Sequence, residues 1–523
     1  MKNIQYSTVY VLLFVMMLTT VSCTKDFNKI NTDPIGTPTA TANQLLAPAL
    51  VNVLSSNMLR NRNFNNELMQ VTVDLGDSEG KVFRYDIRTT LATTSWNDWY
   101  KELTNLKDIY HIASQKGTEN TSYQAISLIS EAWVSQMLTD VYGDVPYSEA
   151  NKGKEGLIEP VFDKQEDIYQ DLFKKLELAN TLLMEQVKIV PTGDPVYQGD
   201  ISKWRRLGNS LYLRMLLRVS AKSEVNSQVV AKIKEIVDEN PANYPIMEDN
   251  THTAKILWNG TNSTTTVYSS PFMINIRAVD FRSSALADFF LGHLTNWGDP
   301  RVDPKLGVNS VSRYGIAAGP NGYVGVPSGY AQGTSVGKQA YFYSDATTNN
   351  PTTLQTDPHT GIMMNVAEVD FILAEAAAKG WIKGNAAAYY YKGIADAINY
   401  WLPQLWAGDA ITKAKEYALA ADMGWNDSFP LNSTLAGTQS KLELIHMQKY
   451  HALFLVDYQQ WLEYRRTGHP ILPKGTGLVN GGKMPARLNY PVVTQSTNPV
   501  NYRKAVAAQG PDDVNTLVWW QRP

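Results

Sequence analysis

The chain has 523 residues, of which 44% are hydrophobic and 19% charged, and its formal net charge at pH 7 is −3. This length supplies enough apolar surface for a large core. The near-neutral charge excludes the electrostatic footprint of a nucleic-acid-binding protein or of one held by an acidic membrane surface. Cys23 is the only cysteine, so no intramolecular disulfide can form.

The N-terminus predicts export. Lys2 precedes an apolar run from Val9 to Leu18, and small or β-branched residues follow from Thr19 to Ser22. This is the layout of a secretory signal peptide, which we place at residues 1–22. A helix of about ten residues spans only ~15 Å, half the hydrocarbon thickness of a bilayer, so a permanent transmembrane anchor is not expected.

Cys23 follows this segment directly, in the position of the acylated cysteine of a bacterial lipoprotein. We expect cleavage before Cys23 and its acylation, for example with palmitate. Each buried methylene adds about 0.8 kcal/mol of membrane affinity, so two or three acyl chains hold such a protein firmly. The polar residues 23–38 would then form a lipidated tether. The alternative is cleavage elsewhere, which would leave Cys23 as a free thiol.

Helical periodicity dominates residues from about 39 to 250. Three segments repeat apolar residues at steps of three and four. Asp163 and Glu166 begin the second segment three positions apart, which predicts a capping box with Asp163 as the N-cap. The three segments are marked by Ile126, Ile129, Trp133 and Met137, by Ile168, Leu172, Leu176, Ala179 and Leu183, and by Leu211, Met215 and Leu216 within Trp204 to Ser220.

A second helical block runs from Asn365 to about Tyr464. Asn365 is predicted to cap a helix that ends at Gly380, and Asn385 to cap the next. Small alanines where these helices meet indicate packing of helix pairs of the tetratricopeptide type. The sequence therefore predicts a mostly α-helical fold in a single domain, residues 39–523. Its helical scaffold covers about 39–250 and 360–470, and its irregular C-terminal tail covers 471–523.

Between the helical blocks, about residues 255–350 lose apolar periodicity. Glycines are frequent from Gly307 to Gly337, and Tyr and Trp residues are scattered through the segment. A loop region of this length in a compact chain is usually functional or disordered. Two interpretations stay open: a surface covering whose rings pack onto the core, and a ligand-facing surface of exposed rings held by the helices.

No catalytic motif is supported. GTSVG around Ser335 matches the nucleophile-elbow pattern, but that motif requires a strand before the serine and a helix after it, and the flanking sequence favours neither. His446 and His451 are five positions apart on a predicted helix and do not share a face closely, so no metal site is predicted. We expect no cofactor and no enzymatic activity.

Two adjacent arginines mark the most distinctive local string, WLEYRRTGHPIL from Trp461 to Leu472. Arg465 and Arg466 stand at a predicted helix end, where cationic side chains stabilise unpaired carbonyl groups. We expect them to be structural clamps rather than ligand contacts.

Several strings along the chain, taken in order, resemble the SusD/RagB family of outer-membrane nutrient-binding lipoproteins. Each is weak alone, and their shared order makes the resemblance specific over nearly the whole chain. They are KDFNKINTDP after Cys23, LTDVYGDVPYSEA (Leu138 to Ala150), PVFDKQEDIY (Pro160 to Tyr169), KWRRLGNSLYLRMLLR (Lys203 to Arg218), GDPRV (Gly298 to Val302), WLEYRRTGHP (Trp461 to Pro470), and PARLNYP (Pro485 to Pro491) with Asn498, Asn501, Tyr502, Trp519 and Trp520 behind it.

The resemblance implies a surface-exposed outer-membrane lipoprotein, anchored through Cys23, that binds a glycan and delivers it to a SusC-like TonB-dependent transporter. Asp140, Tyr142, Gly143, Asp144 and Pro146 match the family, and we interpret them as a structural turn.

The ligand residues of the family are variable, so the candidate contacts come from the chemistry of sugars. Apolar sugar faces lie on Tyr and Trp rings, and sugar hydroxyls need amides and carboxylates around them. We expect Trp258, Trp297, Tyr323 and Tyr330 to supply much of the ligand platform in residues 255–350.

Three other functions stay open. The cargo can be a peptide or another nutrient, since a fold does not specify a ligand. The protein can be an enzyme acting on glycans, because the spacing of a carboxylate pair is not visible in one sequence. It can also be a structural lid without a ligand of its own, which buried aromatics in residues 255–350 would favour.

Overall fold

The structure, a computed structural model, describes residues 40–76, 78–259, 268–307, 310–344, 353–433, 435 and 438–522. The predicted signal peptide, the tether and Cys23 lie outside the described residues. Within Ala42–Pro523, which forms one compact unit, helices predominate and every strand has four residues or fewer. The predicted mostly α-helical fold is confirmed.

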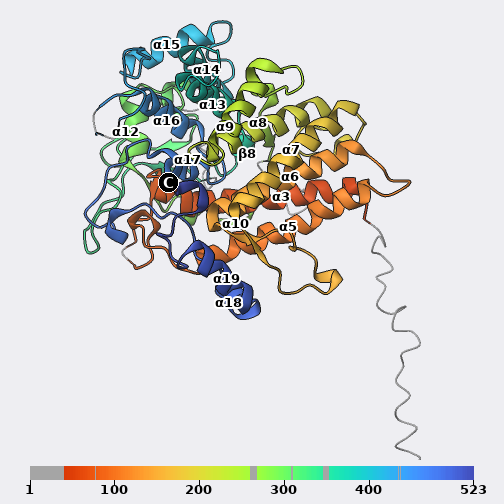
Figure 1. Cartoon of the computed structure of the whole chain (residues 1–523). Coiled ribbons are helices and arrows are strands. Elements are labelled where there is room, and N and C mark those ends of the chain that lie inside the picture. Colours follow the sequence, from red (N-terminus) through yellow and green to blue (C-terminus); the bar gives the residue numbers. More distant parts are fainter. Residues whose placement is uncertain are drawn as a thin grey trace, which may run out of the picture. The chain divides into compact units, whose positions relative to one another are not determined.

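Five long helices build the first half of the scaffold and lie side by side in Figure 1. Each packs against its neighbour in the chain, so the block is a series of helix pairs. Its central helix, α6, is buried on all sides from Ala125 to Tyr142, as a helix surrounded by others must be. The five helices are α3 (Ala42–Arg60), α5 (Leu91–Ala113), α6 (Thr121–Tyr142), α7 (Gln165–Leu182) and α8 (Ile201–Val219).

A second block of helices follows residue 365, drawn in cyan to blue in Figure 1. The Asn365 side chain accepts a 2.9 Å hydrogen bond from the backbone N–H of Glu368, and Asn385 does the same for Ala388 at 2.9 Å. Both predicted caps are confirmed. The helices are α13 (Val366–Ala378), α14 (Ala386–Trp401), α15 (Ala410–Ala420), α16 (Lys441–Ala452) and α17 (Gln459–Thr467).

The predicted capping box at the start of α7 is wrong. Lys164 is the N-cap and makes no side-chain cap hydrogen bond. Asp163 ends β3 (Phe162–Asp163), which pairs with β2 (Val145–Pro146). Its carboxylate accepts hydrogen bonds from the N–H groups of Tyr147 and Ser148, both at 2.9 Å, and from the Ser148 hydroxyl at 2.7 Å. The three donors of this turn hold the carboxylate away from the helix.

The remaining elements are short. Each of the four sheets among the described residues is an antiparallel pair of strands. The remaining strands are β1 (Thr72–Val73), β4 (Ala254–Ile256), β5 (Ala285–Leu286), β6 (Ile316–Ala317), β7 (Tyr341–Phe342) and β8 (Gly361–Met364); the remaining helices are α4 (Asn66–Leu68), α9 (Asn226–Lys234), α10 (Pro271–Asn275), α11 (Ala278–Phe281), α12 (Asp288–Asn296), α18 (Val492–Thr497) and α19 (Pro499–Gln509).

One extended hydrophobic core joins the two helical blocks and takes in buried side chains from residues 254–342 as well. Trp99, Trp204 and Trp461 are its largest fully buried side chains. None of the helices in the described ranges combines the length and the apolar character needed to cross a bilayer. The irregular segments and the helical scaffold therefore share one core.

Candidate functional site

Three open clefts among the described residues are large enough for a small saccharide. We name them by their residues. The Glu131 cleft, of about 790 Å³, lies between α5, α6 and α7. The Arg206 cleft, of about 550 Å³, lies beside α8 and α14. The Lys203–Lys255 cleft, of about 580 Å³, lies between residues 191–198, the start of α8 and β4.

The polar groups of the Glu131 cleft are largely bound to one another. Lys175 Nζ lies 2.8 Å from a carboxylate oxygen of Glu131. The Tyr147 hydroxyl donates to Asp171 at 2.6 Å, and Lys107 Nζ donates to the carbonyl of Ala150 at 3.0 Å. A ligand would have to replace these contacts, which lowers the net gain of binding.

The charged side chains of the Arg206 cleft are also paired. Arg206 pairs with Glu248 at 2.9 Å, and Lys392 pairs with Asp370 at 2.8 Å and with Asp396 at 2.7 Å. Its charged groups therefore offer little free binding capacity.

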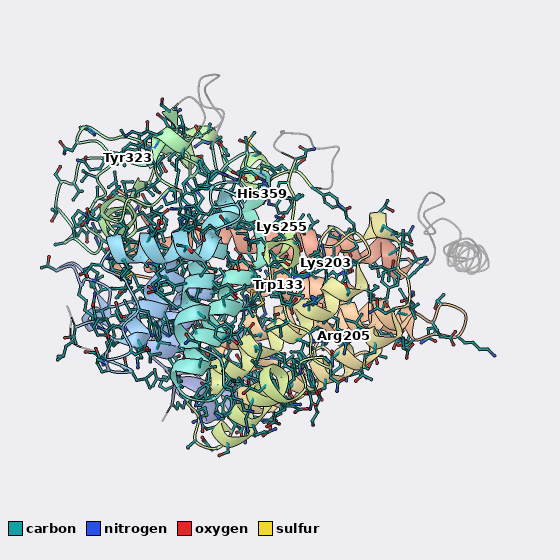
Figure 2. All side chains as sticks on the ribbon, turned by 90° about the horizontal axis from the view of Figure 1, so that it is seen from above. Trp133, Lys203, Arg205, Lys255, Tyr323 and His359 are labelled. Carbon is teal, nitrogen blue, oxygen red and sulfur yellow. The ribbon has the colours of Figure 1, made fainter. Side chains whose placement is uncertain are left out.

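The Lys203–Lys255 cleft differs because both of its lysines are uncommitted. Neither Nζ atom forms a hydrogen bond or an ion pair with a residue in the described ranges. Lys203 lies on the first turn of α8 and Lys255 on β4, and both side chains are partly exposed. In Figure 2 the two lysines are labelled on the same part of the molecule, well separated from Tyr323.

One wall of this cleft is held rigidly by Asp194. Its buried carboxylate accepts hydrogen bonds from the N–H groups of Val196, Tyr197 and Gly199, at 3.0, 3.2 and 2.9 Å. The indole of Trp204 donates a fourth at 2.8 Å. A loop fixed by four such bonds loses little conformational entropy when a ligand binds.

The opposite wall is tied to the first. The Tyr197 hydroxyl donates a 2.7 Å hydrogen bond to the carbonyl of His252, just before β4. β4 pairs with β8, which leads into α13. Lys255 Nζ lies 4.9 Å from the ring centroid of Tyr400, and burial lowers the pKa of its ammonium group. Both walls therefore stand on the helical scaffold.

Apolar surface completes the cleft. Tyr268 lines it with a partly exposed ring, and Leu257, also in the wall, is 48% exposed. The backbone N–H of Asn259 donates to the carbonyl of Tyr268 at 2.9 Å, which positions the tyrosine beside the end of β4. Aromatic and aliphatic faces beside uncommitted donors are what a saccharide requires.

The four aromatics predicted as ligand contacts are Trp258, Trp297, Tyr323 and Tyr330. None of them lines any of the three clefts. Trp258 is 2% exposed and its indole packs on Gly361, whose missing side chain leaves the room. Tyr330 is 8% exposed and packs on Phe83 at a centroid distance of 5.0 Å.

Trp297 and Tyr323 keep part of their rings exposed. Trp297 follows α12 and stacks on His293 at 5.1 Å, with the two ring planes 26° apart. Tyr323 lies after the turn from Gly319 to Gly322, and its hydroxyl is 3.4 Å from the carbonyl of Ile316. These two residues of the loop-rich segment 255–350 therefore keep some surface available to a ligand.

Sequence reasoning missed Lys203, Lys255 and Tyr268. The string PTGDPVYQGD, residues 191–200, is rich in Pro, Gly and Asp, which marks a loop. Its meeting with β4 is a tertiary contact for which the sequence carries no local signal. Ser335 lies in loop on both sides, so the structure lacks the strand and helix that a nucleophile elbow needs.

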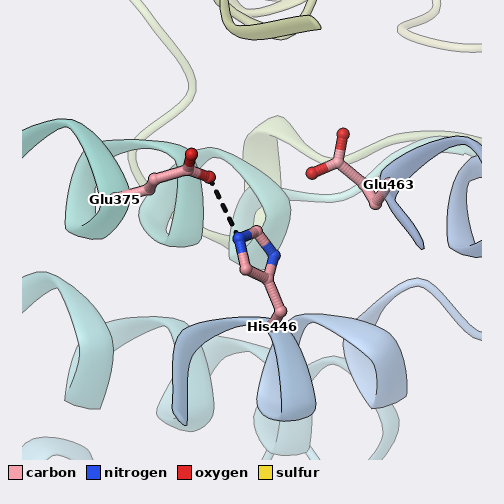
Figure 3. A group of neighbouring side chains, drawn as sticks. All are labelled: Glu375, His446 and Glu463. Carbon is pink, nitrogen blue, oxygen red and sulfur yellow. Dashed lines mark ion pairs between the residues drawn. The ribbon is translucent and has the colours of Figure 1, made fainter. Parts of the chain in front are cut away.

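A buried acid–histidine cluster has the composition of a metal site. Glu375 on α13, His446 on α16 and Glu463 on α17 each place a possible ligand atom within 4.8 Å of the others, and Figure 3 shows them facing one another. His446 Nε2 lies 3.3 Å from Glu375 Oε2.

Cations already pair with both carboxylates of that cluster. Arg466 contacts Glu375 at 2.6 Å and Glu463 at 2.8 Å, and Lys449 contacts Glu463 at 2.8 Å. Burial alone would raise the pKa of Glu375, but the charges of Arg466 and Lys379 hold it well below its usual value. A divalent ion here would face these cations, so the residues do not fit a metal.

The predicted clamp role of Arg466 and Arg465 agrees with these contacts. Arg466 links α17 to α13 through Glu375. Arg465 donates to the carbonyl of Asp140 at 2.7 Å and to the Gln521 side chain at 2.8 Å. Both arginines bind residues far away in the chain, and Arg466 also binds Glu463 on its own helix; no hydrogen bond to a carbonyl of that helix end is seen among the described residues.

Comparisons with known proteins agree with this architecture. The profile of a SusD-like family, described as starch-binding and associating with the outer membrane, matches residues 34–491. No curated protein matches the chain. A solved chitin-binding protein is 25% identical, with a TM-score of 0.69, over 92% of this chain and 100% of that one.

Two further solved structures have the same fold. A SusD homologue from Bacteroides uniformis is 23% identical, with a TM-score of 0.69, over 92% of this chain and 99% of its own. A chitin-binding SusD homologue from Flavobacterium johnsoniae is 21% identical, with a TM-score of 0.71, over 92% and 98% of the two chains.

Proposed function

The chain belongs to the SusD-like family of binding proteins associated with the outer membrane, and from this premise we propose that it captures a glycan and delivers it to a SusC-like TonB-dependent transporter. The family match covers most of the chain, and the chitin-binding relative at 25% identity supports a saccharide as cargo. The protein acts by binding and has no catalytic step of its own.

The observation that carries this proposal is the Lys203–Lys255 cleft. Its walls are fixed by hydrogen bonds, its lysine ammonium groups are uncommitted, and the Tyr268 ring is partly exposed. A sugar ring packs its apolar face on an aromatic ring while its hydroxyls bind polar groups at the rim. In the other two clefts most of the charged groups already have hydrogen-bond or ion-pair partners.

The loop-rich segment, residues 255–350, supplies additional contacts in this proposal. Tyr323 and Trp297 are each partly exposed, so they can contact parts of a long glycan chain that lie outside the cleft. Contact roles for Trp258 and Tyr330 require their buried rings to be uncovered when the ligand binds.

Acylation of Cys23 anchors the protein at the cell surface in this proposal. The compact unit begins at Ala42, so the residues after Cys23 serve as a tether to the membrane. Replacing Cys23 with Ser should release the protein into the soluble fraction and remove the acyl mass from its N-terminus. Persistence of both properties in Cys23→Ser would contradict the anchor.

The function is tested by titrating the purified protein with a panel of oligosaccharides in a calorimeter while chromatography follows the sugars. We expect saturable binding of one glycan class and recovery of the sugar unchanged. Accumulation of shortened products would show an enzyme. Absence of binding across the panel, with binding of peptides instead, would overturn the glycan assignment.

A further inference from the structure

Two ammonium groups face one cleft without a described anionic partner. Lys203 and Lys255 both line the Lys203–Lys255 cleft, and neither Nζ has an ion pair or hydrogen bond among the residues the structure describes. Lys255 is partly buried, and Tyr400 offers it only the face of a ring. A partly desolvated cation of this kind is unfavourable until an anion approaches.

The carboxylates near the cleft are already engaged. Asp194 accepts four N–H donors. Asp200 caps α8 by accepting from the backbone N–H of Lys203 at 3.2 Å. Asp249 accepts from the N–H and the hydroxyl of Thr251 at 2.8 and 2.6 Å. Asp194 and Asp249 stabilise their own loops. Desolvation alone would raise the pKa of Asp200, but hydrogen bonds from Ser202 and from the backbone of Lys203, and then the charge of Lys203, lower it, and Asp200 forms no ion pair with that lysine.

The other ionisable neighbours offer no free negative charge to Lys255. Arg313 forms an ion pair with Asp357. The charge of that carboxylate is therefore already balanced by Arg313. Burial and then the charge of Lys255 lower the pKa of His359, which Figure 2 labels close to Lys255. Residues 260–267, between β4 and Tyr268, have the sequence GTNSTTTV, which contains no acidic residue.

We propose that the Lys203–Lys255 cleft binds an anionic saccharide, with the two lysines contacting its carboxylate or sulfate groups and Tyr268 contacting a sugar face. The inference rests on the proposed glycan-binding function and names the substrate class of that site. Ammonium groups form charge-assisted hydrogen bonds with such anions, and the fixed walls hold the cations in place before the ligand arrives.

The test compares three trisaccharides of equal length: trigalacturonate, a sulfated trisaccharide and neutral N-acetylchitotriose. Each is titrated into the wild-type protein, Lys203→Gln, Lys255→Gln and the double variant. Lys305→Gln is the matched control, because Lys305 is an exposed lysine outside the cleft. Lys255→Arg retains the charge, and melting temperatures verify that every variant is folded.

We expect the wild type to bind an acidic trisaccharide at least about tenfold more tightly than the neutral one, since ammonium groups form strong charge-assisted hydrogen bonds with carboxylate and sulfate groups. Each Lys→Gln variant should lose about tenfold for the acidic ligand only, whereas Lys305→Gln and Lys255→Arg should stay near the wild type. The preferred anion, carboxylate or sulfate, identifies the source of the charge.

Equal affinity for neutral and acidic trisaccharides, or unchanged acidic affinity in the double variant, would overturn this inference and leave glycan capture standing. Binding of neither kind, together with silence across the wider oligosaccharide panel, would overturn glycan capture as well. Raised salt should weaken acidic binding more in the wild type than in the double variant.

Discussion

The indole of Trp133 donates a 2.8 Å hydrogen bond to the Asp457 carboxylate, although the two residues are 324 positions apart. Asn57 on α3 donates to the other carboxylate oxygen at 2.8 Å, and Asn61 donates to the backbone carbonyl of Asp457 at 2.6 Å. Asp457 thereby joins α3 and α6 to the start of α17. Burial raises the pKa of its carboxyl group to about 7.

Asp457→Ala should lower the free energy of unfolding by about 3 kcal/mol, because it leaves the buried donors of Trp133 and Asn57 without an acceptor. Denaturant unfolding at pH 7 measures the loss. Asp457→Asn keeps one acceptor oxygen and should lose clearly less. Equal losses in the two variants would show that the carboxylate is not the joint between the helices.

Arg466→Met should lower the free energy of unfolding by about 3–5 kcal/mol, because it leaves Glu375 and Glu463 buried without their shared guanidinium. Arg503→Met, the same change at an exposed position on α19, is the control and should change stability little. Zinc should not raise the melting temperature of the wild type. A zinc-dependent rise that a chelator reverses would mean that the Glu375–His446–Glu463 cluster binds metal.

His451→Phe should make the protein less sensitive to acid. Both ring nitrogens of His451 are buried without a hydrogen-bond partner among the described residues, and burial lowers its pKa well below 6.5. Below about pH 6.5 the unfolded state therefore binds a proton that the folded state does not. The wild type should lose up to about 1.4 kcal/mol of unfolding free energy per pH unit from this group as the pH falls.

The measurement is the difference in unfolding free energy between the wild type and His451→Phe at pH 7 and pH 5.5. The free energy of unfolding of the wild type should fall relative to that of His451→Phe when the pH is lowered from 7 to 5.5. A pH-independent difference for His451→Phe would contradict the assignment.

Tyr323→Ala should distinguish the contribution of Tyr323 to glycan binding from that of the Lys203–Lys255 cleft. Tyr323 is partly exposed and lies well away from Lys203 and Lys255 in Figure 2. The variant should therefore bind a trisaccharide normally but bind the corresponding polysaccharide several-fold more weakly. Affinity gels and calorimetry measure the two ligands.

Trp258→Ala is the contrasting variant. Because Trp258 is buried on Gly361, its truncation should lower the free energy of unfolding by about 3–5 kcal/mol. Tyr323→Ala should leave stability within about 0.5 kcal/mol of the wild type. Normal polysaccharide affinity in Tyr323→Ala would remove Tyr323 from the binding surface.

The helices were predictable because their signals are local. The apolar stripe from Ile126 to Met137 appears in α6, and the side chains of Asn365 and Asn385 cap α13 and α14. Asp163 shows the limit of such signals. Its spacing to Glu166 fits a capping box, yet three donors in the turn after β2 take its carboxylate.

The candidate site was less accessible to prediction because it is assembled from distant segments. An aromatic ring in a glycine-rich stretch has no local feature that distinguishes an exposed face from a buried one. Trp258 and Tyr330 are buried, whereas Tyr268 in the same part of the chain keeps exposed surface. Lys203 and Lys255 become candidate ligand contacts only because neither ammonium group has an ion pair or hydrogen bond with a described residue, and this depends on the tertiary structure.

The central claim is that a glycan binds in the Lys203–Lys255 cleft, and side-by-side titration of two tyrosine variants tests it most directly. Tyr268 lines this cleft and Tyr110 lines the larger Glu131 cleft, each with a partly exposed ring. Tyr268→Ala should weaken binding of the preferred trisaccharide about tenfold, the cost of losing a central aromatic contact, while Tyr110→Ala should match the wild type. Wild-type affinity in Tyr268→Ala, with a loss in Tyr110→Ala, would contradict the account and move the site to the Glu131 cleft.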